Sequence, residues 1–204
     1  MRAPRQSRSR RTHERLLEAA EALLAERDWG DVSVADIVDR AHSSTGAFYK
    51  HFPGKSELLP LLLQRLDAGV AAVLESLFAD PRWADSPLAE RVDVLVEAMA
   101  GAYLERRRLV RAFVAARFTA QLQLGPRELA VARARMQSLR AWLLLSRVEI
   151  RHPDPEVAVR AGLYLVLQSL QTAMLFEDFP AELPPERLVI EARRLLLAYL
   201  VSAA

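Results

Sequence analysis

Residues 33–52 read SVADIVDRAHSSTGAFYKHF. The apolar spacing predicts a helix of about eight residues, a turn of about three or four, and a second short helix. Ser33 precedes Asp36 by three residues, a pattern that resembles a capping box, and Ser44 can cap the second helix. This is the helix-turn-helix pattern, in which the second helix lies in the DNA major groove with its N-terminal residues against base edges.

The second helix carries residue types that suit contact with DNA. Thr45, Gly46 and Ala47 are small, so the start of the helix can approach the bases closely. Donors that can reach phosphates follow in the chain: Tyr49, Lys50 and His51, with Lys55 on the first turn of the next helix. Phe48 and Phe52 lie four residues apart and would face inward. The alternative is a pair of amphipathic helices whose surface is merely polar, because helical hairpins are common.

A wider pattern resembles the DNA-binding signature of the tetracycline-repressor (TetR/AcrR) family of transcriptional regulators: Ala41-x-x-Ser44-x-Gly46-x-x-Tyr49-x-His51-Phe52-x-x-Lys55-x-x-Leu58-Leu59. The resemblance covers roughly residues 10–70. It implies an all-α fold of about nine helices, with an N-terminal three-helix DNA-binding domain and a C-terminal bundle for ligand binding and dimerisation.

The resemblance also implies roles for individual residues. Tyr49, His51 and Lys55 would hold the phosphate backbone. Thr45 and Gly46, with Lys50, would face base edges. Ser33 would cap the helix that it precedes and touch a phosphate. The full expected DNA-binding set is Ser33, Ser44, Thr45, Gly46, Ala47, Tyr49, Lys50, His51, Lys55, Arg10 and Arg11.

Two residues depart from the family pattern. His42 stands at a turn position where the family usually has Gly, and a positive φ there would be strained for His. Pro60 lies in the first two turns of a long helix expected at 55–79. A proline at that place removes an intrahelical donor and should bend the helix near Ser56.

Composition limits the classes of protein that fit. The chain has 204 residues, 51% of them apolar, and no Cys, which excludes disulfides, thiolate zinc sites and a Cys nucleophile. No apolar run approaches the roughly 18 residues that span a bilayer, and no apolar stretch follows the N-terminal arginines as it would in a secretory signal. We therefore expect a cytoplasmic protein without contact to a membrane. The resemblance implies that it is bacterial and associated with the nucleoid when bound to DNA.

Charge and helix breakers divide the chain into three parts. Residues 1–9 begin an Arg-rich leader that is expected to form a flexible arm, either solvated or in contact with DNA. Residues 10–70 form the expected DNA-binding domain, and residues 71–204 form the expected ligand-binding and dimerisation domain. Helices of the latter are expected near 87–104, 106–121, 126–150, 154–178 and 185–202.

The larger domain contains many aromatic and Met residues, for which core packing is the first explanation. Some of them could also line an apolar pocket, as the resemblance implies. The candidates are Leu66, Met99, Tyr103, Phe113, Arg117, Phe118, Trp142, Tyr164 and Gln168. Residues 106–151 hold eleven Arg against two Glu, which is either a solvated face or a preference for an anionic ligand. The expected effector is an apolar or anionic small molecule.

The stretches near 154–178 and 185–202 are apolar on more than one side. In the resembling family such helices form a dimeric four-helix interface. A homodimer would double the contacts that one short helix makes on a palindrome. Leu167→Glu is expected to dissociate the dimer if that side of the helix faces the partner.

Signs of enzymatic activity are weak. The four His show no metal-ligand spacing, and no Gly-rich phosphate loop is present, so no catalytic residue, metal or cofactor is expected. The sequence predicts a homodimeric, sequence-specific repressor that a small molecule releases from a palindromic operator. The alternatives are an architectural or replication-linked DNA-binding protein of the same fold without an effector, and a helical enzyme or lipid-binding module.

Overall fold

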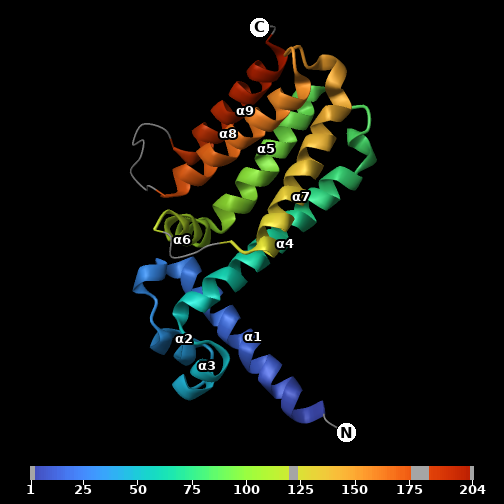
Figure 1. Ribbon diagram of the computed structural model, residues 1–204. Helices are drawn as coiled ribbons and strands as arrows, with labels where there is room; N and C mark the ends of the chain where they lie inside the picture. Colours follow the sequence, from blue (N-terminus) through green and yellow to red (C-terminus); the bar gives the residue numbers. More distant parts are fainter. Residues whose placement is uncertain (1–2, 120–123, 176–183, 203–204) are drawn as a thin grey trace. The chain divides into compact units, whose positions relative to one another are not determined.

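The computed structural model describes residues 3–119, 124–175 and 184–202, and all regular structure within them is helical (Figure 1). The expected all-α fold is confirmed. The chain divides into two compact units. Unit 1 comprises Met1–Asp67 and Arg106–Leu122, and unit 2 comprises Ala68–Glu105 and Gln123–Ala204.

Unit 1 packs the helix-turn-helix residues against longer helices. Its elements are α1 (Ala3–Glu26), α2 (Val34–Arg40), α3 (Thr45–His51), the start of α4 (Leu58–Ala79) and α6 (Arg107–Phe118), with 3-10 turns η1 (Trp29–Asp31) and η2 (Lys55–Glu57). Its core consists of side chains with almost no exposed surface: Leu16, Ala20, Ile37, Phe48, Leu58 and Leu62. Helices as short as α2 and α3 are unstable alone, so their burial against this core holds them in place.

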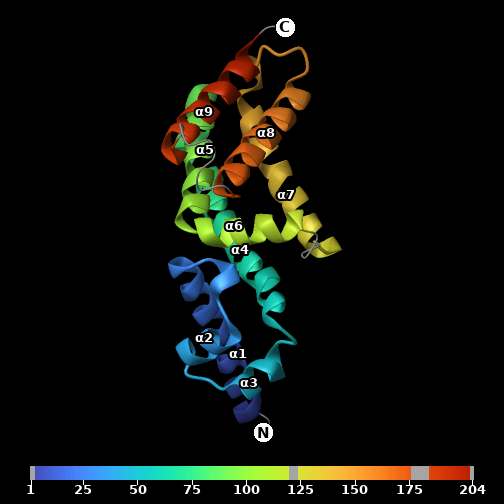
Figure 2. The same cartoon turned by 90° about the vertical axis from the view of Figure 1, so that its left-hand side faces the viewer.

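Unit 2 is a bundle built on the remainder of α4. Its other elements are α5 (Leu88–Glu105), α7 (Pro126–Leu143), α8 (Pro155–Leu175) and α9 (Pro185–Val201), with 3-10 segments η3 (Pro81–Trp83) and η4 (Leu144–Glu149). Helices α8 and α9 lie side by side, and α9 also packs against α5 (Figure 2). Gly162 marks the close approach of α8 and α9, because a Cβ there would collide with Leu196.

A buried arginine fastens one end of unit 2. The Arg91 side chain on α5 is only 1% exposed. It donates hydrogen bonds to the carbonyl oxygens of Trp83, Ala84 and Ser86 in the α4–α5 connection, and to that of Trp142 near the end of α7. Its guanidinium also lies 5.0 Å from the centre of the Trp142 ring. Arg91 therefore ties the α4–α5 connection to α7 by charge-assisted hydrogen bonds.

The start of the chain differs from expectation. Residues 1–9 were expected as a flexible arm, but α1 is helical from Ala3 onward. Pro4 stands in the first turn, where its missing N–H has no helical partner to lose, and neither Gly nor Pro interrupts residues 5–26. The leader is therefore a continuation of α1. Residues 1–2 lie outside the described part of the chain.

The position of Pro60 within α4 also corrects an expectation. The helix begins at Leu58 rather than Lys55, so Pro60 is its third residue. Its missing N–H falls among the first donors of the helix, which have no intrahelical acceptor in any case. No hydrogen bond of the helix is lost, and no bend is required near Ser56.

Two further boundaries differ. The helix expected at 126–150 ends at Leu143 and continues as η4, in which Ser146 has non-helical φ and ψ of −96° and 31°. Helix α6, expected within the larger domain, belongs to unit 1. The expected ends of two other helices, at 121 and 178, lie outside the described residues.

Candidate nucleic-acid interface

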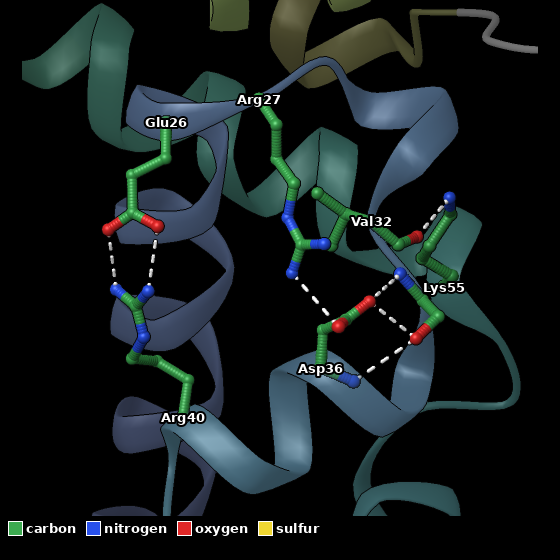
Figure 3. A network of polar contacts seen from close by, with 7 residues as sticks. Glu26, Arg27, Val32, Asp36, Arg40 and Lys55 are labelled. Atoms are coloured by element: carbon green, nitrogen blue, oxygen red, sulfur yellow. Dashed lines mark hydrogen bonds and ion pairs between the residues drawn. The ribbon is translucent and has the colours of Figure 1, made fainter.

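The N-terminus of α2 is closed by the expected capping box. The Ser33 hydroxyl accepts a hydrogen bond from the Asp36 N–H at 3.1 Å, and the Asp36 carboxylate accepts from the Ser33 N–H at 2.7 Å (Figure 3). Asp36 also accepts from the Ser33 hydroxyl and pairs with Arg27 at 2.9 Å. These bonds, first of all the one from the Ser33 side chain, lower the pKa of Asp36 to about 2. The start of the helix-turn-helix is therefore fixed by a charged cap.

The turn between α2 and α3 passes through the left-handed backbone region. His42 has φ 46°, the one positive value among the non-glycine residues described, as its departure from Gly led us to expect. The Ser43 N–H donates to the Val38 carbonyl at 2.8 Å and closes the end of α2. The turn is thus built at some conformational cost to an exposed His.

Helix α3 has one buried and one exposed face. The Ser44 hydroxyl accepts a hydrogen bond from the Ala47 N–H at 3.2 Å and caps the helix, as predicted. Phe48 is completely buried, and Phe52 directly after the helix nearly so. The opposite face presents the side chains expected to meet DNA: Thr45, Tyr49 and Lys50 are exposed, together with Gly46. A Cβ at Gly46 would meet no atom of the chain within 4 Å.

His51 is the last residue of α3 and lies beside a second histidine. The rings of His13 on α1 and His51 are 5.8 Å apart between centres, and the His13 ring lies 4.9 Å from that of Phe52. Burial lowers the pKa of His51 below its usual value, and the charges of His13 and Lys50 add to this effect. His13 was not singled out by the sequence, since it falls outside the motif. His13 lies three and four residues before the buried Leu16 and Leu17, so it shares their face of α1. That spacing could have indicated its position.

Lys55, expected to hold a phosphate, contacts backbone carbonyls of its own unit in the structure. Its Nζ donates to the Trp29 and Val32 carbonyl oxygens, both at 2.7 Å, and lies 4.8 Å from the centre of the Trp29 ring. Figure 3 shows the Lys55 side chain directed at Val32, beside the Ser33–Asp36 cap. The residue belongs to η2 rather than to the first turn of α4. The ammonium of Lys55 is therefore engaged by backbone groups of unit 1.

The expected arginines of the leader lie on the surface of α1. Arg10 and Arg11 are exposed, as are Arg8 and Arg15. They precede Leu16, the first residue that unit 1 buries, so this part of the helix projects beyond the core. The structure thus places a helical, basic segment on the same unit as α3.

A family model described as "Bacterial regulatory proteins, tetR family" matches residues 16–61, from the first buried turn of α1 into the start of α4. Residues 16–61 of the chain are therefore similar to the DNA-binding part of tetR-family regulators. A curated tetR-type relative, described as the uncharacterized HTH-type transcriptional regulator YvdT of Bacillus subtilis (strain 168), is 33% identical over 54 residues. That match spans 26% of this chain and 28% of the relative.

Solved tetR-family structures resemble most of the chain. A regulatory protein from Rhodococcus RHA1 has a TM-score of 0.67 and 18% identity, covering 95% of this chain and 98% of that one. RolR, solved in complex with the ligand resorcinol, has a TM-score of 0.57 and 22% identity, covering 94% and 90%. At these identities the likeness establishes a shared fold. The relatives are named as regulators rather than enzymes.

The residues expected to line a pocket are distributed over both units. Leu66, Phe113, Arg117 and Phe118 belong to unit 1, whereas the other five belong to unit 2: Met99, Tyr103, Trp142, Tyr164 and Gln168. Phe118, Arg117, Tyr164 and Gln168 are exposed. Within unit 2, the Tyr103 hydroxyl accepts a hydrogen bond from the Gln171 side chain at 3.4 Å. The polar residues expected from the sequence in this region include Gln168 instead of Gln171.

The structure shows which apolar residues of the last two helices are exposed. Leu167, expected to contact a partner if its side of the helix faces one, is 7% exposed and packs within its own unit. Tyr164 and Leu165, its neighbours on α8, are 59% and 61% exposed, and Leu195 on α9 is 69% exposed. The period of the helix turns Leu167 inward and Leu165 outward.

Acidic residues of α1 and its C-terminal end pair with the arginines of α6. Arg106 pairs with Glu21 at 3.0 Å, and Arg111 with Asp28 at 3.5 Å. Glu21 also pairs with Arg65 of α4 at 3.1 Å. Part of the basic run at 106–151 is thereby neutralised within unit 1. Within the described residues, no group of three or more acidic or histidine side chains is placed to hold a metal, and no helix there is long and apolar enough to cross a membrane.

Proposed function

We propose that the chain is a homodimeric, sequence-specific DNA-binding regulator, a repressor that a small molecule releases from a palindromic operator. The observation that carries this proposal is α3. It is capped by Ser44, anchored on its inner face by Phe48, and presents Thr45, Gly46 and Tyr49 on its outer face. A recognition helix needs the same three features, because its exposed N-terminal residues must reach base edges while its other face stays fixed.

Contacts to DNA divide by chemistry. Thr45 and Gly46 at the start of α3 would lie against base edges, with Ala47 beside them. Tyr49, Lys50 and His51 would bind phosphates and set the register of the helix on the duplex. The exposed Arg10 and Arg11 would add phosphate contacts from α1, which raises the salt dependence of binding. Ser33 and Ser44 act first as helix caps, so their hydroxyls are already engaged.

The exposed apolar residues of α8 and α9 favour self-association. Tyr164, Leu165 and Leu195 are large side chains with more than half of their surface exposed, and all three lie on the two helices that the resembling family uses for dimerisation. Exposed apolar side chains that together form a patch are typical of protein–protein interfaces. A two-fold dimer would present two copies of α3 to a palindrome.

The proposed effector is a small apolar or anionic molecule bound in unit 2. The RolR structure with resorcinol supports an aromatic ligand for a relative of this fold. The Tyr103–Gln171 pair supplies polar groups within an apolar bundle, as ligand sites usually do. Binding of effector and DNA must then weaken each other by the same factor, typically about 5- to 150-fold.

Fluorescence anisotropy of the full chain on a palindromic duplex, enriched from a random-sequence pool, tests the proposal. We expect specific binding that weakens steeply as salt rises, and release of the duplex by a hit from a thermal-shift screen of small molecules. Binding no tighter than to random duplex would favour an architectural role. Absence of any DNA binding would favour a helical enzyme or lipid-binding module.

A further inference from the structure

Lys55 makes its contacts entirely inside unit 1. Its ammonium donates two hydrogen bonds of 2.7 Å to backbone carbonyls, those of Trp29 and Val32, and lies over the face of the Trp29 ring. An ammonium has three donors, so two of them are used and the aromatic face occupies one side of the group. The ammonium of Lys55 is therefore held in place by backbone groups and an aromatic face of unit 1.

The place of these contacts along the chain is informative. Val32 directly precedes Ser33, the first residue of the helix-turn-helix motif, and Lys55 follows Phe52, its last residue, by three positions. The two hydrogen bonds thus join segments 23 and 26 residues apart. They tie together the chain entering α2 and the chain leaving α3, so the motif becomes a closed loop.

We propose that Lys55 is a positioning residue, which fixes the presentation of α3 to DNA by tying together the two ends of the helix-turn-helix, and is not itself a phosphate contact. The inference rests on the proposed DNA-binding function and assigns one residue of that site a different task. Its physical basis is the free energy that would be lost if the ammonium left its carbonyl acceptors to bind a phosphate. Turning the ammonium toward a phosphate would withdraw two charge-assisted donors from carbonyls in a half-buried place.

The surrounding charges favour the same location. Asp31 and Asp36 raise the pKa of Lys55, opposing the stronger effect of burial, which lowers it. Asp36 is also the acid of the capping box that closes α2. The cation consequently stabilises the segment around Ser33 through two carbonyls and a nearby carboxylate, and loosening it would free the start of α2.

The composition supplies a matched control, because Lys50 and Lys55 are the only lysines of the chain. Lys50 is exposed on the outer face of α3, whereas Lys55 is half-buried. The test measures the affinity of full-length Lys55→Ala, Lys55→Met, Lys55→Arg and Lys50→Ala for the enriched duplex, over a range of salt concentrations. The fraction of folded protein is measured for each variant by circular dichroism, and affinities are expressed per folded molecule.

We expect Lys55→Ala and Lys55→Met to bind roughly tenfold more weakly, with the salt slope of the wild type. Lys50→Ala should instead lower the slope by about one per subunit. Lys55→Arg should not restore binding, since a planar guanidinium cannot replace a compact ammonium between two carbonyls, although it would serve a phosphate equally well. A slope lowered as in Lys50→Ala, full binding by Lys55→Arg, or unchanged affinity per folded molecule would each overturn the proposal.

Reductive methylation of the wild-type chain, followed by mass spectrometry of its two lysines, gives a measurement that needs neither DNA nor a variant that folds. Lys50 should react rapidly and Lys55 slowly in the free protein, and added duplex should slow only Lys50. Equal reactivity in the free protein, or protection of Lys55 that appears only with duplex, would contradict the engagement of Lys55. If the wild type shows no preference for any duplex, the proposed function fails, while slow methylation of Lys55 would still show that the tie exists.

Discussion

Phe48 and Tyr49 are neighbours in the chain and have opposite environments. Phe48 is completely buried, whereas Tyr49 is 55% exposed, since successive residues of a helix point about 100° apart. A single turn of α3 therefore supplies both an anchor to the core and an exposed hydroxyl for the proposed contact with DNA. At the scale of the residue, the interface depends on which side of one short helix each side chain faces.

His42 carries a conformational cost that a single change can remove. Its φ of 46° is disfavoured for any residue with a Cβ, and its side chain is exposed. We expect His42→Gly to stabilise the folded chain by about 0.5–1 kcal/mol, measured by urea denaturation. His42→Ala, the control, keeps the Cβ and should gain nothing. A His42→Gly variant less stable than His42→Ala would show that the Cβ at this positive φ costs less than the added chain flexibility of glycine.

His51 should make DNA binding depend on pH. Burial and the nearby His13 and Lys50 lower its pKa in the free chain, so at neutral pH the ring is uncharged. A phosphate beside the ring would raise that pKa, so complex formation would take up a proton and affinity would increase as pH falls from about 8 to 6. The gain is up to roughly tenfold for each unit by which the pKa rises.

Anisotropy titrations across this pH range check the expectation. His51→Gln keeps a hydrogen-bond donor but cannot titrate, so it should lose most of the pH dependence while retaining part of the affinity. The proposed phosphate contact of His51 is wrong if affinity decreases on acidification, or if His51→Gln depends on pH as strongly as the wild type.

At the scale of the element, Gly46 makes α3 less stable than most other residues at that position would. Gly is among the poorest helix formers, and yet a Cβ there would meet nothing within the chain. Packing inside the protein consequently does not require the glycine, whereas a close approach to base edges would.

We expect Gly46→Ala to stabilise the chain by up to about 1 kcal/mol and to weaken binding to the enriched duplex by roughly tenfold. Thermal denaturation and anisotropy measure the two effects separately. Gly69→Ala on α4 is the matched control: Gly69 is also exposed with open space around it, so this change should stabilise the chain and leave DNA affinity unchanged. Equal DNA affinity for Gly46→Ala and the wild type would remove Gly46 from the interface.

At the scale of the whole molecule, the two units leave different surfaces exposed. Unit 1 exposes the polar face of α3 and the arginines of α1, whereas unit 2 exposes large apolar residues on α8 and α9. The first kind of surface suits a polyanion, and the second suits another apolar surface. Function as a dimeric regulator requires both surfaces.

Substitution by a charged residue tests whether the exposed apolar residues of α8 and α9 mediate the proposed dimerisation. Leu165→Glu and Leu195→Glu place a carboxylate on exposed positions and should dissociate the dimer while leaving the helical content unchanged. Leu167→Glu is the contrasting variant, because it buries a charge within unit 2 and should lower the free energy of unfolding by about 3 kcal/mol or more. Analytical ultracentrifugation and circular dichroism distinguish these outcomes. Exposed-site variants that sediment as the wild-type dimer would place the interface elsewhere.

Local chemistry was enough to predict much of this protein. The capping box at Ser33 and Asp36, the cap at Ser44 and the inward Phe48 were predicted from spacing alone, because caps and helix faces depend on residues within four positions of one another. The strained backbone at His42 was anticipated only through the resemblance, in which a Gly usually holds that turn position. The all-α class followed from short-range apolar spacing.

Contacts between distant residues were decided by the tertiary structure. No local pattern indicates that Lys55 reaches two carbonyls 23 and 26 residues away, that α6 packs into unit 1, or that Leu165 rather than Leu167 is exposed. A side chain's partner depends on which elements meet, and that depends on the burial of apolar surface summed over the whole chain. The sequence alone determined the helical class and the caps at Ser33 and Ser44, because these depend on neighbouring residues. Packing between helices decided which of their charged and apolar side chains are exposed.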